Sequence, residues 1–228
     1  MSDRPYVLLS CAMSADGYID DAGPERLRLS SAADFDRVDA VRAGCDAILV
    51  GAGTVRADDP KLLIRSAARR ERRAARGLPA DLTKVTLTWS GDLDPAARFF
   101  TAGEAPKLVY APSATAAELA PRLDGLAEVV DAGDPLDLPT VLRDLAARGV
   151  RRLMVEGGGG VHTLFLTAGL VDELQLVVAP FFIGDPSAPR FVRSGVFPQS
   201  PDRPMRLEDA TRIGDLALLR YRVGAARG

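Results

Sequence analysis

The sequence predicts an α/β protein whose sheet is mostly parallel and doubly wound, with an antiparallel hairpin at its C-terminal end. Short apolar runs typical of buried strands alternate with segments of helical apolar periodicity. The last two runs of the sequence, Arg206–Ile213 and Leu216–Val223, are separated only by Gly214 and Asp215, which is the spacing of a hairpin. No repeat or linker interrupts this pattern, so we expect a single domain over residues 1–228, with a core from about 5 to 223.

The strands are predicted from apolar runs of strand length that are bounded by turn residues. We expect them at Tyr6–Met13, Asp46–Val50, Val85–Trp89, Lys107–Ala111, Ala127–Asp131, Leu153–Val155, Asp172–Ala179, Arg206–Ile213 and Leu216–Val223.

The helices are predicted from apolar spacing and from residues that favour helix ends. Ser31 has a good N-cap side chain, and Gly44 is a natural end for the helix between them. Further helices are expected at Thr115–Leu123, Leu138–Arg148 and Val161–Ala168. The segment Arg65–Gly77 contains six arginines and is interpreted as a solvated helix or a mobile loop.

Composition excludes several classes of function. The net charge is −2, and the arginine-rich segment lacks interleaved aromatic residues, so we expect no nucleic-acid partner. The single histidine is His162, and the two cysteines Cys11 and Cys45 form no Cys-x-x-Cys motif. We therefore predict no metal site and two reduced thiols. With no signal peptide and no apolar run near the ~20 residues of a membrane helix, a cytoplasmic protein is expected.

The segment Arg151–Thr167 carries the main chemical signal. A short strand ends at Glu156, the glycines 157–160 follow, and a helix is expected to begin near Val161. Backbone N–H groups and the helix dipole at such a turn favour an anion, and glycine lets a phosphate approach without a Cβ in the way. The alternative is a strand-to-helix turn that needs glycine only for tight packing. A second glycine turn, 51–60, also follows a strand.

Other motifs of catalysis and phosphate binding are missing. The Walker lysine, a G-x-G-x-x-G fingerprint and a convincing Ser-His-Asp arrangement are all absent. From the residues alone, the prediction stops at an α/β protein that binds a phosphorylated ligand at two glycine turns.

Three stretches of the sequence resemble one protein family. They are PYVLLSCAMSADGYI, VRAGCDAILVGAGTVRADDPKLLIR and LMVEGGGGVHTLFLTAGLVDELQLVVAPFFIG. They are similar to the reductase domain of the riboflavin-pathway deaminase–reductases and to its stand-alone relatives, which share the dihydrofolate-reductase-like fold. The zinc-deaminase motifs H-x-E and P-C-x-x-C are absent, so the resemblance is to the reductase unit alone.

The resemblance implies an NADPH-dependent reductase that acts on a phosphorylated ribosylaminopyrimidine, of the 5-amino-6-(5-phosphoribosylamino)uracil type, and yields a ribitylamino product. It implies cofactor contacts at Ala12, Thr54, Asp58, Ser90, Gly158, Gly159, Gly160, Val161, His162, Thr163 and Leu164. It implies substrate contacts at Arg42, Leu62, Arg65 and Glu156, with Glu156 and Asp58 as the catalytic residues.

Physical chemistry agrees with several of these roles and leaves alternatives open. Arg42 and Arg65 are suited to holding a phosphate through forked hydrogen bonds, although surface salt bridges are the simpler interpretation. Glu156 is suited to accepting hydrogen bonds from a pyrimidine, or it is only a partner of the helix dipole.

Three further roles are open at this point. Asp58 and its neighbour Asp59 are also natural turn-formers before a proline. His162 is interpreted as a residue near the cofactor phosphate, with a general base as the less favoured role, and Arg56 is a possible partner of the 2′-phosphate of NADPH.

The sequence departs from the family pattern in the expected substrate pocket. Ser10 stands where the family has a lysine, while Arg26 and Arg28 replace a serine and a tryptophan. A reductase of another heterocycle, such as a dihydropterin, is therefore an alternative, as is a non-catalytic nucleotide-binding protein. A homodimer is expected from the stand-alone relatives, with the apolar run Leu174–Ile183 as interface or as core.

Overall fold

The computed structural model describes residues 3–23 and 27–223. Contacts group the chain into two compact units, one built mainly from Asp39–Met154 and the other mainly from Val7–Val38 and Val155 onward. The expectation of a single domain over residues 1–228 remains a prediction. Arg26, one of the departures from the family pattern, lies outside the described residues.

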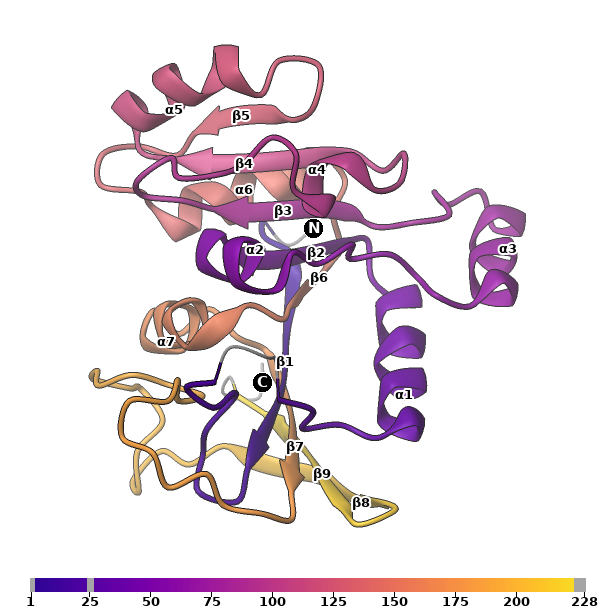
Figure 1. Cartoon of the computed structure of the whole chain (residues 1–228), viewed down its shortest axis with the longest axis vertical. Helices are drawn as coiled ribbons and strands as arrows, with labels where there is room; N and C mark the ends of the chain where they lie inside the picture. Colours follow the sequence, from indigo (N-terminus) through magenta and orange to yellow (C-terminus); the bar gives the residue numbers. More distant parts are fainter. Residues whose placement is uncertain (1–2, 24–26, 224–228) are drawn as a thin grey trace. The chain divides into compact units, whose positions relative to one another are not determined.

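The first unit is organised around parallel strands. The strands β5 (Glu128–Asp131), β4 (Lys107–Ala111), β3 (Thr83–Leu87), β2 (Ala47–Gly51) and β6 (Arg152–Val155) follow one another in this order (Figure 1). From β2 to β5 the neighbouring strands are paired in parallel. Every residue of β2 is buried, as expected for a central parallel strand that is covered on both faces.

Helices follow most of the strands of this unit. They are α2 (Ala52–Asp58), α3 (Ala67–Ala75), α4 (Arg98–Thr101), α5 (Ser113–Leu119), the 3₁₀ turn η1 (Ala120–Arg122) and α6 (Leu138–Ala147). The arginine-rich segment is therefore helical, and Ser66 accepts a hydrogen bond at its start. The short helices α2 and α4 were not predicted. The second glycine turn is in fact the start of α2.

The second unit contains the predicted hairpin. The strands β1 (Tyr6–Ser14), β7 (Glu173–Ala179), β9 (Leu216–Arg222) and β8 (Arg206–Ile213) follow in this order. β1 and β7 are parallel, whereas β7, β9 and β8 pair antiparallel. A core of Leu29, Val177, Ala179, Leu216 and Leu218 covers one face of the hairpin. The expected mostly parallel α/β class with an antiparallel C-terminal edge is thus confirmed.

Two helices complete the description. α1 (Ala32–Ala43) begins after Ser31, whose hydroxyl accepts a hydrogen bond from the Asp34 N–H at 3.2 Å, so the predicted N-cap is confirmed. α7 runs from Gly158 to Thr167 and begins three residues before the predicted start. The glycines are therefore the first turn of the helix itself and not a loop in front of it.

Both cysteines are free thiols, Cys45 buried and Cys11 half-buried. Within the described ranges, no helix has the length and apolar character needed to cross a bilayer.

Candidate functional site

The predicted site residues fall into two sets, one in each unit, and each set is described separately. The second unit holds Ala12, Glu156 and the first turns of α7. The first unit holds Arg42, Thr54, Asp58, Leu62, Arg65 and Ser90.

The start of α7 leaves its backbone donors without a side-chain cap. Gly157 is the N-cap residue and makes no side-chain hydrogen bond, because it has no side chain. Gly158 follows with φ of +71°, a conformation that residues with a Cβ rarely adopt. Uncapped N–H groups at the positive end of a ten-residue helix are suited to an anion. This geometry fits an anion such as a phosphate, and the binding of a dinucleotide here stays a prediction.

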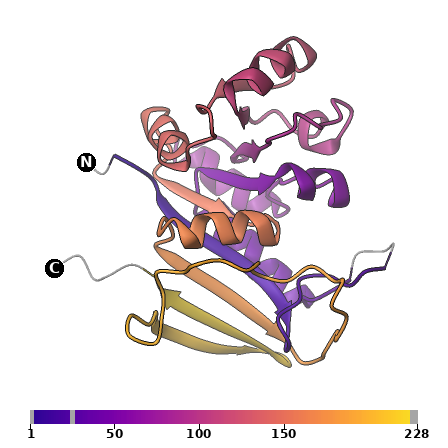
Figure 2. The ribbon, with the colours of Figure 1, turned by 90° about the vertical axis from the view of Figure 1, so that its left-hand side faces the viewer.

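A segment from the loop after β7 packs against this turn. We call Pro189–Arg193 the strap; its backbone N–H at Arg193 donates to the Thr163 hydroxyl at 2.8 Å. On its other side, Phe191 N–H donates to the Gly17 carbonyl and Ile19 N–H donates to the Pro189 carbonyl. The loop passes α7 on its way to β8 (Figure 2). The strap therefore ties α7 to the turn that follows β1.

Two of the glycines have different reasons for lacking a side chain. A Cβ on Gly159 would lie 2.2 Å from the carbonyl oxygen of Arg190, which is far inside contact distance. A Cβ on Gly160 would lie 3.6 Å from the guanidinium carbon of Arg193, which is an ordinary contact. Tight packing, the alternative considered for this turn, thus accounts for Gly159. Gly160 has no backbone atom at such a close distance.

The carboxylate of Glu156 lies in a setting of buried titratable groups. Burial raises the pKa of the Cys11 thiol, and the charge of Glu156 raises it further. Burial lowers the pKa of His162 to about 4, although the hydrogen bond to Phe191 and the charge of Glu156 act in the opposite direction. At neutral pH, Glu156 is therefore accompanied by an uncharged thiol and an uncharged imidazole.

His162 is 1% exposed and lies in the second turn of α7. Its Nδ1 is 3.2 Å from the Phe191 carbonyl oxygen, so Nδ1 carries the proton and donates it to the strap. Its Nε2 is buried and has no hydrogen-bond partner among the described residues. A neutral, buried imidazole does not supply a proton near pH 7, and it leaves one acceptor for a ligand donor or a water.

The remaining predicted residues of the second unit surround this turn. Thr163 donates to the Gly159 carbonyl at 2.7 Å, Val161 is buried and Leu164 is half-buried. Ala12 lies on β1 opposite Val177 of β7. Ser10, which replaces the family's lysine, is buried on the same strand at 6% exposure, so a short neutral hydroxyl replaces a long cation there.

In the first unit, three of the predicted substrate residues lie together. The Arg42 guanidinium donates to the Leu63 carbonyl at 3.4 Å. Leu62 is buried and has φ of +51°, which is a strained conformation for leucine. The Arg65 N–H is bound by the buried carboxylate of Asp39. The Arg42 guanidinium of α1 thus contacts the short segment that carries Leu62 and Arg65.

The predicted cofactor residues of this unit lie around α2. Thr54 and Asp58 are half-buried on α2, and Ser90 is exposed after β3. Asp59 ends α2 in the left-handed region and accepts from the Arg98 Nε at 2.8 Å, so Asp59 is the turn-former of the pair. Arg56 donates to the Asp92 carbonyl at 2.7 Å and also faces its carboxylate. The guanidinium proposed for a 2′-phosphate is thus already bound to Asp92.

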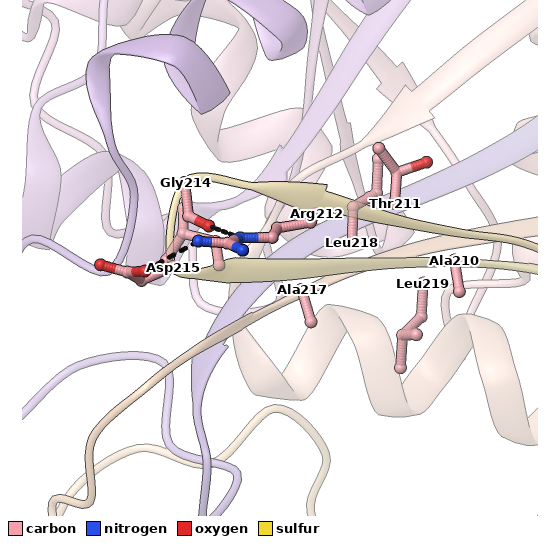
Figure 3. A pocket seen from close by; sticks show the side chains of 9 residues that line it. Ala210, Thr211, Arg212, Gly214, Asp215, Ala217, Leu218 and Leu219 are labelled. Atoms are coloured by element: carbon pink, nitrogen blue, oxygen red, sulfur yellow. Dashed lines mark hydrogen bonds and ion pairs between the residues drawn. The ribbon is translucent and has the colours of Figure 1, made fainter.

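A surface hollow on the β8–β9 hairpin contains none of the predicted residues. It is lined by Ala210, Thr211, Arg212, Gly214, Asp215, Leu216, Ala217, Leu218 and Leu219 (Figure 3). Its charged groups, Arg212 and Asp215, are 3.6 Å apart and almost fully exposed. An exposed ion pair in a hairpin turn is weak. We do not assign the chemistry to this hollow.

Sequence reasoning missed the residues that hold both sets in place. Asp39 and Asp81 bind the backbone of the Leu62–Ser66 segment, and Phe191 binds His162. The only local signal was the proline-rich character of the loop that contains the strap.

Comparison with known proteins identifies relatives over almost the whole chain. The RibD C-terminal domain family matches residues 5–219. The chain is 37% identical to the 2,5-diamino-6-ribosylamino-4(3H)-pyrimidinone 5′-phosphate reductase of Archaeoglobus fulgidus, over 93% of this chain and 95% of that protein. It is 33% identical to the reductase of the same name from Methanothermobacter thermautotrophicus, over 96% and 99% of the two chains.

A solved structure supports the same grouping. RibD of Acinetobacter baumannii matches with a TM-score of 0.79 and 25% identity, covering 98% of this chain. The match spans 59% of the RibD chain, so this chain corresponds to a part of that protein. The resemblance carried by the glycine turn and by the Asp-Asp-Pro segment is therefore confirmed. The chain belongs to the RibD C-terminal domain family.

Proposed function

We propose that this protein is an NADPH-dependent reductase of a ribosylaminopyrimidine 5′-phosphate in riboflavin biosynthesis, with a ribitylamino product. The observation that carries the proposal is the uncapped glycine start of α7, which directly follows Glu156 in the second unit. It combines donors for a cofactor phosphate with a carboxylate for a heterocycle. Near full-length similarity to two proteins named as such reductases supports it.

Two substrates differ only at C2 of the pyrimidine. One is 2,5-diamino-6-ribosylamino-4(3H)-pyrimidinone 5′-phosphate, after which the relatives of A. fulgidus and M. thermautotrophicus are named. The other is 5-amino-6-(5-phosphoribosylamino)uracil. The diamino form presents an amino group beside a ring N–H, and a carboxylate accepts from both in a forked pair. The uracil form offers N3–H between two carbonyls, but its N1–H lies beside the exocyclic 6-N–H and forms a similar forked pair. The Glu156 carboxylate is therefore suited to either substrate, and parallel assays with the two pyrimidine phosphates separate them.

The reaction assigns a task to each set of residues. When bound, NADPH supplies a hydride from the nicotinamide to C1′ of the sugar, which has opened to an imine. The C=N electron pair then moves to nitrogen, which takes up a proton. Glu156 orients the heterocycle, and Arg42 and Arg65 hold the 5′-phosphate by charge-assisted hydrogen bonds. The N–H groups of Gly158 and Gly160 hold a cofactor phosphate, and Thr54, Asp58, Ser90 and Ala12 are the further cofactor contacts that we propose.

The preference for NADPH over NADH and the cytoplasmic location are also proposals. NADPH is proposed from the family resemblance. Arg56 would have to leave Asp92 to bind a 2′-phosphate. Comparing kcat/KM for NADPH and NADH in the wild type and in Arg56→Gln tests this; an unchanged ratio excludes Arg56 from the preference.

We further propose a homodimer. Leu174, Leu176 and Val177 of β7 are buried, so the first part of the run Leu174–Ile183 serves the core, whereas Phe182 near its end is exposed. The outward face of the hairpin, in contrast, exposes Leu207, which pairs in register with Tyr221. Light scattering after gel filtration should give twice the mass of the chain, and Leu207→Asp should give the monomer.

The proposed function is tested by supplying the purified protein with NADPH and each pyrimidine phosphate. Consumption of NADPH with formation of the ribityl product supports the proposal. Turnover of dihydrofolate alone would favour a different heterocycle, and tight NADPH binding without any turnover would indicate a non-catalytic nucleotide-binding protein. Glu156→Gln should leave NADPH affinity within a few-fold and depress turnover. If its turnover equals that of the wild type, Glu156 is only structural.

Gly158→Glu tests the cofactor-phosphate assignment. Its carboxylate would occupy the anion position, so NADPH affinity should fall at least 100-fold, about 3 kcal/mol. Gly158→Ala is the matched control, because it imposes the same strain at positive φ without the charge. Equal affinity in the two variants would exclude the phosphate from this turn.

A further inference from the structure

We propose that Asp39 is a positioning residue that fixes the Leu62–Ser66 segment and thereby sets the phosphate affinity of Arg42 and Arg65. This inference rests on the proposed function, which assigns the substrate phosphate to these two arginines. It adds a residue to the site for which the resemblance implies no role.

The carboxylate of Asp39 binds three donors that come from one stretch of chain. Its two oxygens accept from the Arg65 N–H at 2.5 Å, the Ser66 N–H at 3.2 Å and the Arg69 guanidinium at 2.9 Å. The side chain is 3% exposed, so these bonds form away from water. Burial alone would raise the pKa of Asp39, but the three donors outweigh burial and lower it. The group is therefore ionised at neutral pH and anchors two consecutive amides.

A second carboxylate holds the preceding residue. The Ile64 N–H donates to Asp81 at 2.9 Å, so the backbone N–H groups of three consecutive residues are bound by two acids. Just before them, Leu62 is buried with φ of +51°. A leucine keeps such a conformation only where its surroundings hold it there. Asp39 and Asp81 provide this restraint, and Asp39 carries the larger part of it.

Arg42 is connected to the same segment. It lies three residues after Asp39, one turn further along α1, and its guanidinium donates to the Leu63 carbonyl. Asp39 thus holds the backbone from which the Arg65 side chain extends, and Arg42 reaches that backbone from the same helix. Loosening the segment would change the separation of the two cations that we assign to one phosphate. Two cations hold a phosphate well only at a fixed separation.

Electrostatics alone predicts the opposite effect of removing Asp39. A negative charge near a phosphate site opposes phosphate binding, so Asp39→Asn should lower KM if charge were its only contribution. Loss of the anchored amides should raise KM. The sign of the change therefore separates the two roles.

The experiment measures KM and kcat for the pyrimidine phosphate, and Kd for ribose 5-phosphate, in Asp39→Asn and Asp39→Ala. We expect KM and Kd to rise about 10-fold in Asp39→Asn, with kcat and the KM for NADPH within about 2-fold. Hydrogen exchange of the 62–66 amides should become faster. Asp39→Ala should show a larger rise, and Asp39→Asn remains the decisive variant if Asp39→Ala does not fold.

Two controls isolate the anchoring. Arg69→Gln removes the ion pair but leaves both amides bound, so its KM should change by less than about 3-fold. Asp144→Asn alters a half-buried carboxylate elsewhere in the same unit, which binds Tyr110 and Arg148, and it should leave KM unchanged.

Each outcome decides one question. An unchanged or lower KM in Asp39→Asn, with an active wild type, overturns the positioning role and leaves the proposed function intact. A wild type without turnover that still binds ribose 5-phosphate, more weakly in Asp39→Asn, overturns the proposed function and supports the positioning role. If Arg69→Gln matches Asp39→Asn, only the ion pair matters and the role of the anchored amides is overturned.

Discussion

The first turn of α7 and the Leu62–Ser66 segment are both held by distant parts of the chain, but by different forces. At α7, the carbonyl of Arg190 lies against Gly159. His162 donates a neutral hydrogen bond to the strap, and the Thr163 hydroxyl accepts one from the Arg193 N–H. The Leu62–Ser66 segment is held instead by the carboxylates of Asp39 and Asp81.

The two regions should therefore fail in different ways. Where two backbones pack closely, a substitution that adds volume lowers stability, whereas a change of charge nearby has little effect. Carboxylates that bind amides tolerate changes of volume nearby but depend on the charge of the acid. In the proposed reductase, the first turn of α7 is therefore shaped by packing and the Leu62–Ser66 segment by charge.

The largest effect is expected for Gly159→Ala. Alanine favours helix by about 1 kcal/mol over glycine, but its Cβ would lie 2.2 Å from a backbone oxygen that cannot move alone. Overpacking of this kind costs about 3 kcal/mol, which corresponds to a fall of roughly 5–10 °C in Tm. Thermal unfolding measures it.

Gly160→Ala is the matched control for that prediction. The same methyl group would meet only the Arg193 guanidinium at 3.6 Å, so stability should remain within about 1 kcal/mol of the wild type. If both variants lose stability equally, the close approach of the strap is not what requires glycine in this turn.

The second effect is a loss of stability in acid that comes from His162. Its pKa falls from 6.5 to about 4 because it is buried, so the unfolded chain binds a proton that the folded chain does not. The contribution of His162 to the free energy of unfolding is fully present above pH 6.5. It is lost as the pH falls toward 4, and the total loss is about 3 kcal/mol.

His162→Gln should remove that part of the acid dependence while an amide N–H still reaches the Phe191 carbonyl. Urea unfolding at pH 7 and at pH 4.5 measures the difference between the two proteins. If the free energy of unfolding falls equally in wild type and variant between pH 7 and pH 4.5, His162 is protonated in the folded state at pH 4.5.

Local patterns predicted the regular elements well. Lys107–Ala111 and Arg206–Ile213 have the predicted boundaries, because proline or glycine residues lie close to both ends of each segment. The helices α2 and α4 were missed because seven and four residues are too short to show a helical period, and the glycines and Asp-Pro of the first favour a turn.

The features that hold the site were beyond such patterns. α7 begins at Gly158 against the low helix propensity of glycine, because the strap, some thirty residues later, packs on it. Asp39 is an ordinary acid of a helix in the sequence, and its role appears only when Arg65 and Ser66 are placed beside it. Resemblance supplied the predicted site residues, but not what positions them.

A smaller loss of stability is expected for Arg190→Ala, which removes a side chain of the strap and keeps its backbone. The Arg190 guanidinium lies 4.3 Å from the centre of the Tyr18 ring and donates to its hydroxyl at 2.8 Å. Arg190→Ala should cost about 1 kcal/mol, because the arginine is exposed, although the Tyr18 ring that it contacts is buried. Chemical denaturation measures it. A loss as large as that of Gly159→Ala would show that the strap is held by this side chain and not by its backbone.

The smallest effect is expected for Asp81→Asn. Asparagine keeps an oxygen that can accept from the Ile64 N–H, so only the charge-assisted part of one hydrogen bond is lost. Stability should fall by less than about 1 kcal/mol, measured by urea unfolding, and KM for the pyrimidine phosphate should stay within about 2-fold. Asp39→Asn removes charge from two amides and a guanidinium, so it should exceed Asp81→Asn in both measurements. If the order is reversed, the segment is held mainly from the Asp81 side, and charge at Asp39 is not what fixes the substrate half of the site.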